Sequence, residues 1–87
     1  MYVMVDVEAD GPIPGDYSMA SFGAVVVAPK PEERVWFYSG PIKPISDKWQ
    51  PEALKVSGHT RDELMRGASP ADTMMLFEVW VQHNVKK

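Results

Sequence analysis

A short apolar strand that carries an acidic residue at every second position constrains this chain most. Residues 3–11 read VMVDVEADG. Side chains alternate between the two faces of a strand, so Asp6 and Glu8 are predicted to share one face about 6.6 Å apart, with Asp10 beside them if the strand extends that far. Carboxylates next to an apolar run repel one another, and hard cations with oxygen ligands are their usual partners. The pattern therefore predicts a metal site on the first strand.

Two other interpretations of this stretch stay open. In the simpler one, the strand ends in a turn at Asp10-Gly11 and the acidic side chains are solvated. In the other, the same acids open a calcium-binding EF-hand loop. The twelfth position of such a loop would be Tyr17 where a bidentate acid is required, and residues 2–5 favour a strand where a helix should enter. These mismatches disfavour the calcium loop.

Length and composition limit the class of protein. Eighty-seven residues with 45% hydrophobic content indicate one small folded domain. Cysteine is absent, which suits a reducing compartment, and no secretion signal or membrane-length apolar run is visible, so we expect a cytoplasmic protein without a membrane partner. The net charge of −3 disfavours a module that holds nucleic acid through a broad basic surface.

Strand patterns come first in the chain and helix patterns second. Prolines and charges at 29–33 interrupt two β-rich segments and predict a hairpin. A capping-box pattern at Thr60–Glu63 and the pair Ser69-Pro70 each predict the start of a helix. The sequence thus predicts an α/β domain in which three antiparallel strands precede helices, with strands at about 2–8, 17–28 and 34–39 and helices at about 51–57, 61–66 and 70–83.

The last predicted helix is apolar over more than one stripe. Its apolar residues are Ala71, Met74, Met75, Leu76, Phe77, Val79, Trp80 and Val81. We expect them to pack as core against the sheet, and we expect burial on most sides of this helix.

Three segments in order resemble the DEDD-type (DnaQ-like) 3′-to-5′ exonucleases, which have the ribonuclease H-like fold. Asp6-Val7-Glu8 resembles the D-x-E of their first motif. Residues 18–25, SMASFGAV, resemble their second strand, which reaches a Gly-Ala after a short apolar run. Residues 57–64, SGHTRDEL, resemble their Gly-Ile-Thr-type helix start.

The resemblance implies hydrolysis of a phosphodiester at the 3′ end of single-stranded DNA or RNA, assisted by two Mg²⁺ or Mn²⁺ ions. By this analogy Asp6 bridges both ions and Glu8 holds one of them near the attacking water. Paired ions of this kind stabilise the attacking and leaving oxygens and lower the pKa of water. Asp10 and Gly11 are candidates for contact with the terminal nucleotide. His59, just before a helix cap, is a candidate either for substrate contact or for a local hydrogen bond.

The family's second and third acidic motifs do not occur in these 87 residues. The resemblance therefore implies a single partial exonuclease domain over 1–87, apparently truncated, that supplies only the first motif. In the family another strand lies beside the first one, so here the first strand is expected to be a bare edge, and we expect a homo-oligomer. The alternative from a different functional class is a non-catalytic oligomeric interaction module or metal-binding module.

Overall fold

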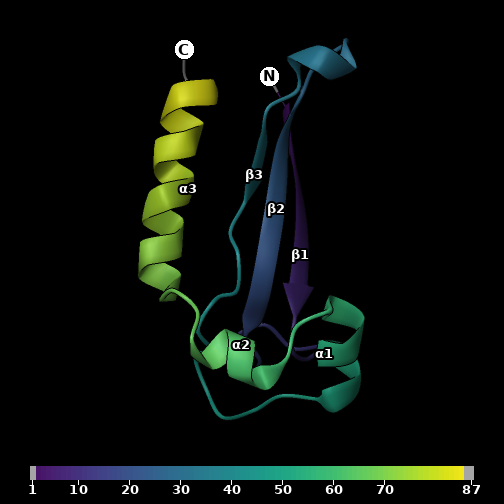
Figure 1. Ribbon diagram of the computed structural model, residues 1–87, viewed down its shortest axis with the longest axis vertical. Coiled ribbons are helices and arrows are strands. Elements are labelled where there is room, and N and C mark those ends of the chain that lie inside the picture. The colour runs from purple at the N-terminus through teal and green to yellow at the C-terminus, as the bar shows by residue number, and fades with distance from the viewer. Residues whose placement is uncertain (1, 86–87) are drawn as a thin grey trace.

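The computed structural model describes residues 2–85 and shows a sheet of three antiparallel strands followed by helices (Figure 1). This confirms the α/β arrangement that the sequence predicts, whereas the ribonuclease H-like topology stays a prediction. In the described residues the sheet order is β1-β2-β3, with β2 in the middle. The elements are β1 (Tyr2–Ala9), β2 (Met19–Val27), a 3-10 turn η1 (Pro31–Glu33), β3 (Trp36–Tyr38), α1 (Pro51–Ser57), α2 (Arg61–Met65) and α3 (Pro70–Asn84).

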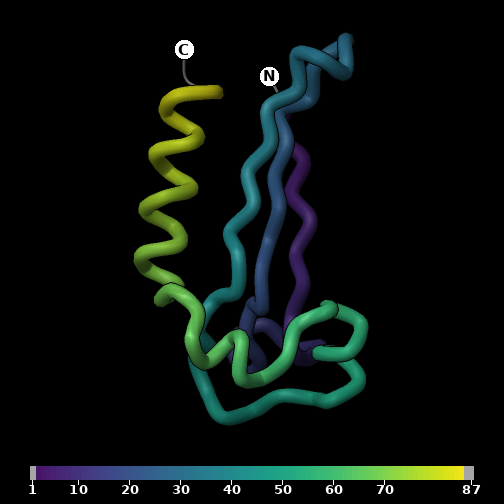
Figure 2. The backbone as a smooth tube through the Cα atoms, in the orientation of Figure 1, coloured from purple at the N-terminus to yellow at the C-terminus, as the bar shows by residue number. Residues whose placement is uncertain are grey.

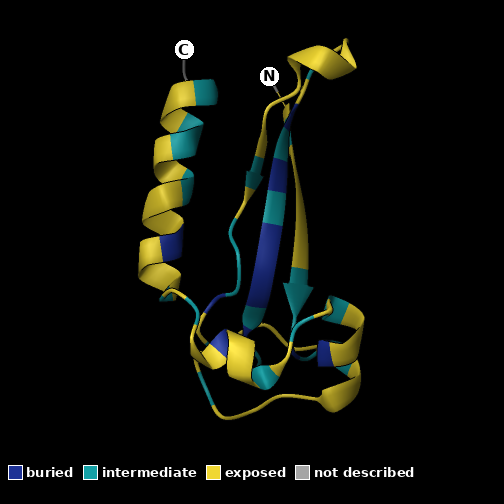
Figure 3. Cartoon of the chain, in the orientation of Figure 1, coloured by how far each residue is buried: buried dark blue, intermediate teal, exposed yellow. Residues whose placement is uncertain are grey.

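The central strand β2 carries more buried residues than any other described element, as Figure 3 shows. Ala20, Phe22, Ala24 and Val26 alternate along it and are all buried. Apolar β-branched and aromatic residues at alternate positions form such a strand because they cover one face of the sheet while the pleat turns their neighbours to the other. The helix α3 lies along the sheet in Figure 1, and we call the face that it covers the helix face.

Aromatic side chains hold α3 on the helix face. Phe77 meets Phe22 edge to face with ring centroids 5.1 Å apart, and Trp80 lies 5.8 Å from Phe37. Such pairs add about 0.5–1.5 kcal/mol to the burial of their area. Core packing of this part of the helix is therefore confirmed. Burial on most sides is not found in the described residues, because the side of α3 away from the sheet is exposed at Met74, Met75, Leu76 and Val79.

Two short helices close one end of the sheet (Figure 1). Leu54 of α1 and Leu64 of α2 form a buried cluster with Ala20. Gly58 ends α1 with a φ of 80°, in the left-handed region where glycine has no steric penalty. Thr60 and Glu63 form the predicted capping box at the start of α2. The long segment between β3 and α1 runs past these helices at the same end (Figure 2).

Most strand boundaries differ from the prediction by one or two residues. β2 begins at Met19 instead of residue 17, since the hydroxyl of Ser18 is engaged by the backbone N–H of Ile45 and its carbonyl by Asp10. β3 ends at Tyr38, because beyond it the N–H of Phe22 donates to the Ser39 side chain instead of a backbone carbonyl. None of the helices in residues 2–85 combines the length and the apolar run needed to cross a bilayer.

Candidate active site

Asp6 and Glu8 lie on β1 and share the face of the sheet opposite α3. In the register of β1 and β2, Asp6 pairs with Gly23 and Glu8 pairs with Ser21, and directly opposed residues project to the same face. Asp6 is exposed and Glu8 is half-buried. The strand thus presents two carboxylates side by side on what we call the carboxylate face, and the alternation predicted this pairing.

Asp10 does not join them, because β1 ends at Ala9 and the strand does not extend that far. The register shifts between Glu8 and Ala9, so the alternation breaks before Asp10. Its carboxylate has no solvent exposure. Oδ1 accepts a hydrogen bond of 2.6 Å from the N–H of Ser18, and Oδ2 lies 3.4 Å from Nη1 of Arg61. Asp10 therefore anchors the segment that follows the strand. Contact between Asp10 and a substrate stays a prediction, and the burial of its carboxylate does not favour that contact.

Packing against Tyr17 leaves no room for a side chain at Gly11. A Cβ at this position would overlap the ring of Tyr17, far inside van der Waals contact. A mainly apolar cavity of about 420 Å³ lies beside it, lined also by Val7, Met19 and Ile42. Close approach of a substrate to the Gly11 backbone stays a prediction, and the ring of Tyr17 already occupies the space that the missing side chain leaves.

His59 lies on the carboxylate face, although it comes from the loop before α2. Its Nε2 is 2.9 Å from Oγ of Ser21 and 3.5 Å from Oη of Tyr38. Its other ring nitrogen, Nδ1, is buried, has no hydrogen-bond partner in the described residues and lies 3.7 Å from Oε2 of Glu63. The backbone N–H of His59 donates to the Ser57 hydroxyl. The ring itself makes no local hydrogen bond in the described residues and reaches instead to Ser21, the strand residue opposite Glu8, and to Tyr38.

The negative charge of Glu63, in the first turn of α2, is stabilised by hydrogen bonds with Thr60. The backbone N–H of Thr60 donates to Oε1 of Glu63 at 3.2 Å, and the N–H of Glu63 donates back to the Thr60 hydroxyl at 3.2 Å. The first of these bonds, helped by the Thr60 hydroxyl and by His59, holds the pKa of Glu63 below its ordinary value of 4.5. Glu63 is therefore ionised at neutral pH and faces the His59 ring.

A second cavity of about 430 Å³ lies on the carboxylate face beyond Asp6. Met4, Gly23, Val25, Arg34 and Trp36 are among the residues that line it. Trp36 is 69% exposed, so a large aromatic surface faces solvent within reach of the acidic strand. Sequence reasoning did not single out Ser21, Gly23 or Tyr38 as site residues. The available signal was their alternate spacing on β2 and β3, which becomes informative only once the pairing register is known.

Asp6 and Glu8 provide some, but not all, of the ligands that a hard divalent cation requires. Carboxylate oxygens are the ligands that Mg²⁺ and Mn²⁺ prefer, and these two carboxylates are directed to one side of a regular strand. Within residues 2–85, however, no group of three or more His, Cys, Asp and Glu side chains comes together as a metal site. The described residues thus supply a pair of ligands and leave the remaining coordination positions to other donors.

Comparison with known proteins gives one informative similarity. No protein-family profile matches the sequence. The chain is 42% identical to the 3′-5′ DNA exonuclease Cap18 of Escherichia coli. The alignment is 88 positions long and covers 100% of this chain and 45% of Cap18. The chain therefore spans less than half the length of this curated relative, and the identity supports an exonuclease relationship for the portion that carries Asp6 and Glu8.

Proposed function

We propose that this chain is the first-motif part of a metal-dependent 3′-to-5′ exonuclease that acts on single-stranded DNA. The observation that carries the proposal is the pair Asp6 and Glu8, which β1 presents together on the carboxylate face. The identity to a relative named as a 3′-5′ DNA exonuclease supports the reaction class and favours DNA over RNA. The ribonuclease H-like fold and the DEDD type belong to this proposal.

In this proposal, Asp6 and Glu8 hold Mg²⁺ or Mn²⁺, two ions in the complete site. Bound divalent ions would supply charge stabilisation at the phosphodiester and a more acidic water. Glu8 is half-buried and is paired with Ser21 in the register of β1 and β2. The exposed Asp6 is open toward solvent and toward the cavity at Trp36. The more exposed carboxylate is thus the one that a phosphate can approach together with an ion.

The test is stepwise shortening of a 5′-labelled single-stranded DNA oligonucleotide in the presence of Mn²⁺, with this chain and its Asp6→Asn variant. A matched control is Asp16→Asn, because Asp16 is an exposed acid outside the carboxylate face, 4.0 Å from Lys48. Because this chain supplies only the first motif, its activity depends on further ligands, for example from a second copy. Where these are supplied, the expected result is loss of nucleotides from the 3′ end by the wild type and by Asp16→Asn, but not by Asp6→Asn. Shortening that persists in Asp6→Asn would contradict the proposed site.

A second function, a non-catalytic interaction module, is favoured by the edge of the sheet. β1 pairs only with β2 in the described residues and exposes Met4, Val5 and Val7, which are 67%, 53% and 48% accessible. An apolar edge strand with free backbone groups recruits another strand. We propose that the chain self-associates through β1. Light scattering behind a sizing column tests this, since a monomer at all concentrations up to the millimolar range would contradict it.

A further inference from the structure

A gap in the side chains of the carboxylate face lies between Asp6 and Tyr38. The register joins Asp6 to Gly23 across β1 and β2, and Gly23 to Tyr38 across β2 and β3, so the three residues form one row across the sheet. Neighbouring strands lie about 4.8 Å apart, which puts the outer two backbones roughly 10 Å from each other. Because the middle residue has no side chain, the carboxylate and the phenol flank an open position.

The backbone does not require glycine at this position. Gly23 is not among the described glycines with positive φ, which are Gly15, Gly40 and Gly58. A Cβ built at Gly23 would meet only the carbonyl oxygen of Phe37, at 3.6 Å, which is ordinary contact. Glycine inside a strand often marks a place where a ligand or another backbone approaches closely. The open position is therefore a feature of the surface, with no origin in backbone strain.

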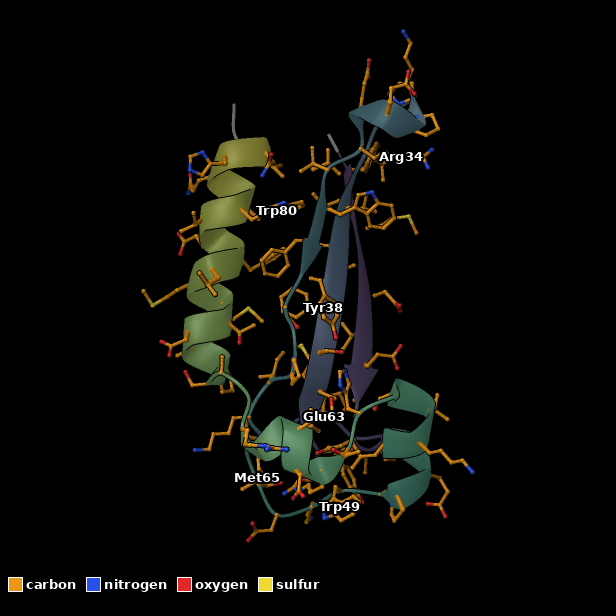
Figure 4. All side chains as sticks on the ribbon, in the orientation of Figure 1. Arg34, Tyr38, Trp49, Glu63, Met65 and Trp80 are labelled. Carbon is orange, nitrogen blue, oxygen red and sulfur yellow. The ribbon has the colours of Figure 1, made fainter. Side chains whose placement is uncertain are left out.

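The side of the gap formed by Tyr38 carries a hydroxyl group that is only weakly engaged, by a long hydrogen bond with His59. Ser21 is 2% exposed, and its Oγ lies 2.9 Å from Nε2 of His59. The Ser21 hydroxyl and this ring nitrogen therefore satisfy each other's hydrogen bonding. Tyr38 is 64% exposed and its Oη is 3.5 Å from the same nitrogen, at the limit of a hydrogen bond. In Figure 4, Tyr38 lies over the sheet, and Glu63 lies at α2, at the end of the sheet. The Tyr38 hydroxyl can thus donate to a ligand in the gap at little cost.

We propose that the gap over Gly23 receives the 3′-terminal nucleotide of a single DNA strand, with the Tyr38 hydroxyl donating to one of its phosphate or sugar oxygens. The exposed phenol ring also offers a face on which a base can stack. His59 is a positioning residue that holds the wall of the gap through Ser21 and Tyr38. The proposal rests on the proposed exonuclease function, because Asp6 on the opposite side of the gap must hold the ion beside the same nucleotide.

The first experiment measures binding of a 5′-fluorescein single-stranded DNA pentamer with phosphorothioate linkages, by fluorescence anisotropy in Mn²⁺. The variants Gly23→Ala, Gly23→Val and Gly23→Leu fill the gap by increasing amounts. We expect the dissociation constant to rise in that order, reaching at least tenfold for Gly23→Leu. Thermal unfolding shows which variants fold, and if the two larger ones do not, Gly23→Ala and the tyrosine variants decide. Binding that is equal in all folded Gly23 variants would overturn the proposal.

The tyrosine and histidine variants test the wall of the gap. Tyr38→Phe removes only the hydroxyl and should weaken binding about three- to tenfold, which is the range for one hydrogen bond. Tyr2→Phe is the matched control, because Tyr2 shares the carboxylate face four residues from Asp6 and is 81% exposed. His59→Leu should weaken binding and His59→Gln should recover most of it, whereas equal binding by Tyr38→Phe and wild type would contradict the role of the hydroxyl.

Asp6→Asn in the same assay separates this proposal from the function on which it rests. Binding by the wild type that is independent of Mn²⁺ and of Asp6, or absent altogether, would contradict the exonuclease proposal and with it the nucleotide gap. Binding that needs Mn²⁺ and Asp6 but is unchanged in the Gly23 and Tyr38 variants would leave the exonuclease proposal in place. That result would assign the gap to another occupant, such as a further protein segment, and would overturn only the inference drawn from it.

Discussion

Arg61 and Asp10 join the start of α2 to the end of β1 through an ion pair, with Nη1 of the arginine 3.4 Å from Oδ2 of a fully buried carboxylate. Arg61 also donates to the carbonyl of Ser46 at 3.0 Å and lies over the ring of Trp49. One cation therefore holds the loop before α1, the turn after β1 and its own helix together. This arrangement anchors the chain directly after β1, and so it helps to hold Glu8, two residues before Asp10, in place.

Replacement of Arg61 by methionine should lower the free energy of unfolding by roughly 3 kcal/mol. The reason is that the Asp10 carboxylate stays buried and loses its counter-charge, and breaking a buried pair from one side costs about 3–5 kcal/mol. Urea unfolding followed by circular dichroism measures the change. Arg66→Met is the control, since Arg66 is exposed at the end of the same helix and should change stability by no more than about 0.5 kcal/mol. Equal losses in both variants would contradict the role of the ion pair.

Manganese should stabilise the folded chain through Asp6. A ligand that binds only the native state raises stability by an amount that grows with its concentration, about 2.7 kcal/mol at one hundred times its dissociation constant. We expect the melting temperature of the wild type to rise with added Mn²⁺ and that of Asp6→Asn to stay constant. In EDTA the variant should melt at or slightly above the wild type, because one of two neighbouring like charges is gone. A rise of the same size in both proteins would exclude Asp6 as a ligand.

The order of the elements and the helix ends could be predicted from sequence because their signals are local. Gly58 ends α1, Thr60 and Glu63 cap α2, and Ser69 caps α3, each through bonds within a few residues. The placement of Asp10 could not be predicted, since it depends on a register irregularity after Glu8 and on an arginine 51 residues away in the chain. Contacts of that kind arise only from the folded topology.

The same distinction applies to the candidate site. Asp6 and Glu8 share a face because they are two residues apart on one strand, so alternation alone places them. Gly23 and Tyr38 join that face only through the pairing of three strands. A slip of one residue in either pairing would turn them to the helix face. Gly23 and Tyr38 can be read from the sequence, but their place beside Asp6 follows only from the strand pairing.

Acid should weaken the capping box at α2. The pKa of Glu63 is below its ordinary value of 4.5, chiefly because the Thr60 backbone N–H donates to the ionised carboxylate. A lowered native pKa means that the unfolded chain binds the proton more readily, so this contribution is full above about pH 4.5 and is lost as the pH falls through the native pKa. Between pH 6 and pH 3, Glu63→Gln should therefore lose less stability than the wild type does. Parallel stability curves for the two proteins would contradict this linkage.

Alanine at position 11 should destabilise the chain through Tyr17. The added methyl group would meet the tyrosine ring, and overpacking of this kind costs about 1–3 kcal/mol. Urea unfolding of Gly11→Ala measures the loss. The double variant Gly11→Ala, Tyr17→Ala removes the ring, so its stability should match that of Tyr17→Ala alone within about 0.5 kcal/mol. Strictly additive losses would show that Gly11 does not act through the Tyr17 ring. That result would favour close approach of a ligand to the Gly11 backbone.

Phe77 should carry most of the attachment of α3 to the sheet. Its ring contacts Phe22, Phe37 and Trp80 at centroid distances of 5.1, 5.2 and 5.7 Å, so it is the centre of the aromatic cluster. Phe77→Ala removes those contacts and leaves a cavity on the helix face, and we expect a loss of about 3 kcal/mol. Met75→Ala, on the exposed side of the same helix, should change stability by less than about 0.5 kcal/mol.

The fluorescence of Trp80 gives a second measure of that attachment, provided that the signals of Trp36 and Trp49 are removed by substitution with phenylalanine. Trp80 is directed toward the sheet in Figure 4 and is half-buried. Release of α3 in Phe77→Ala should shift its emission to longer wavelength before the rest of the chain unfolds in urea, because the helix touches the sheet mainly through this cluster. A single cooperative transition with coincident fluorescence and circular dichroism would instead show that α3 and the sheet unfold as one unit.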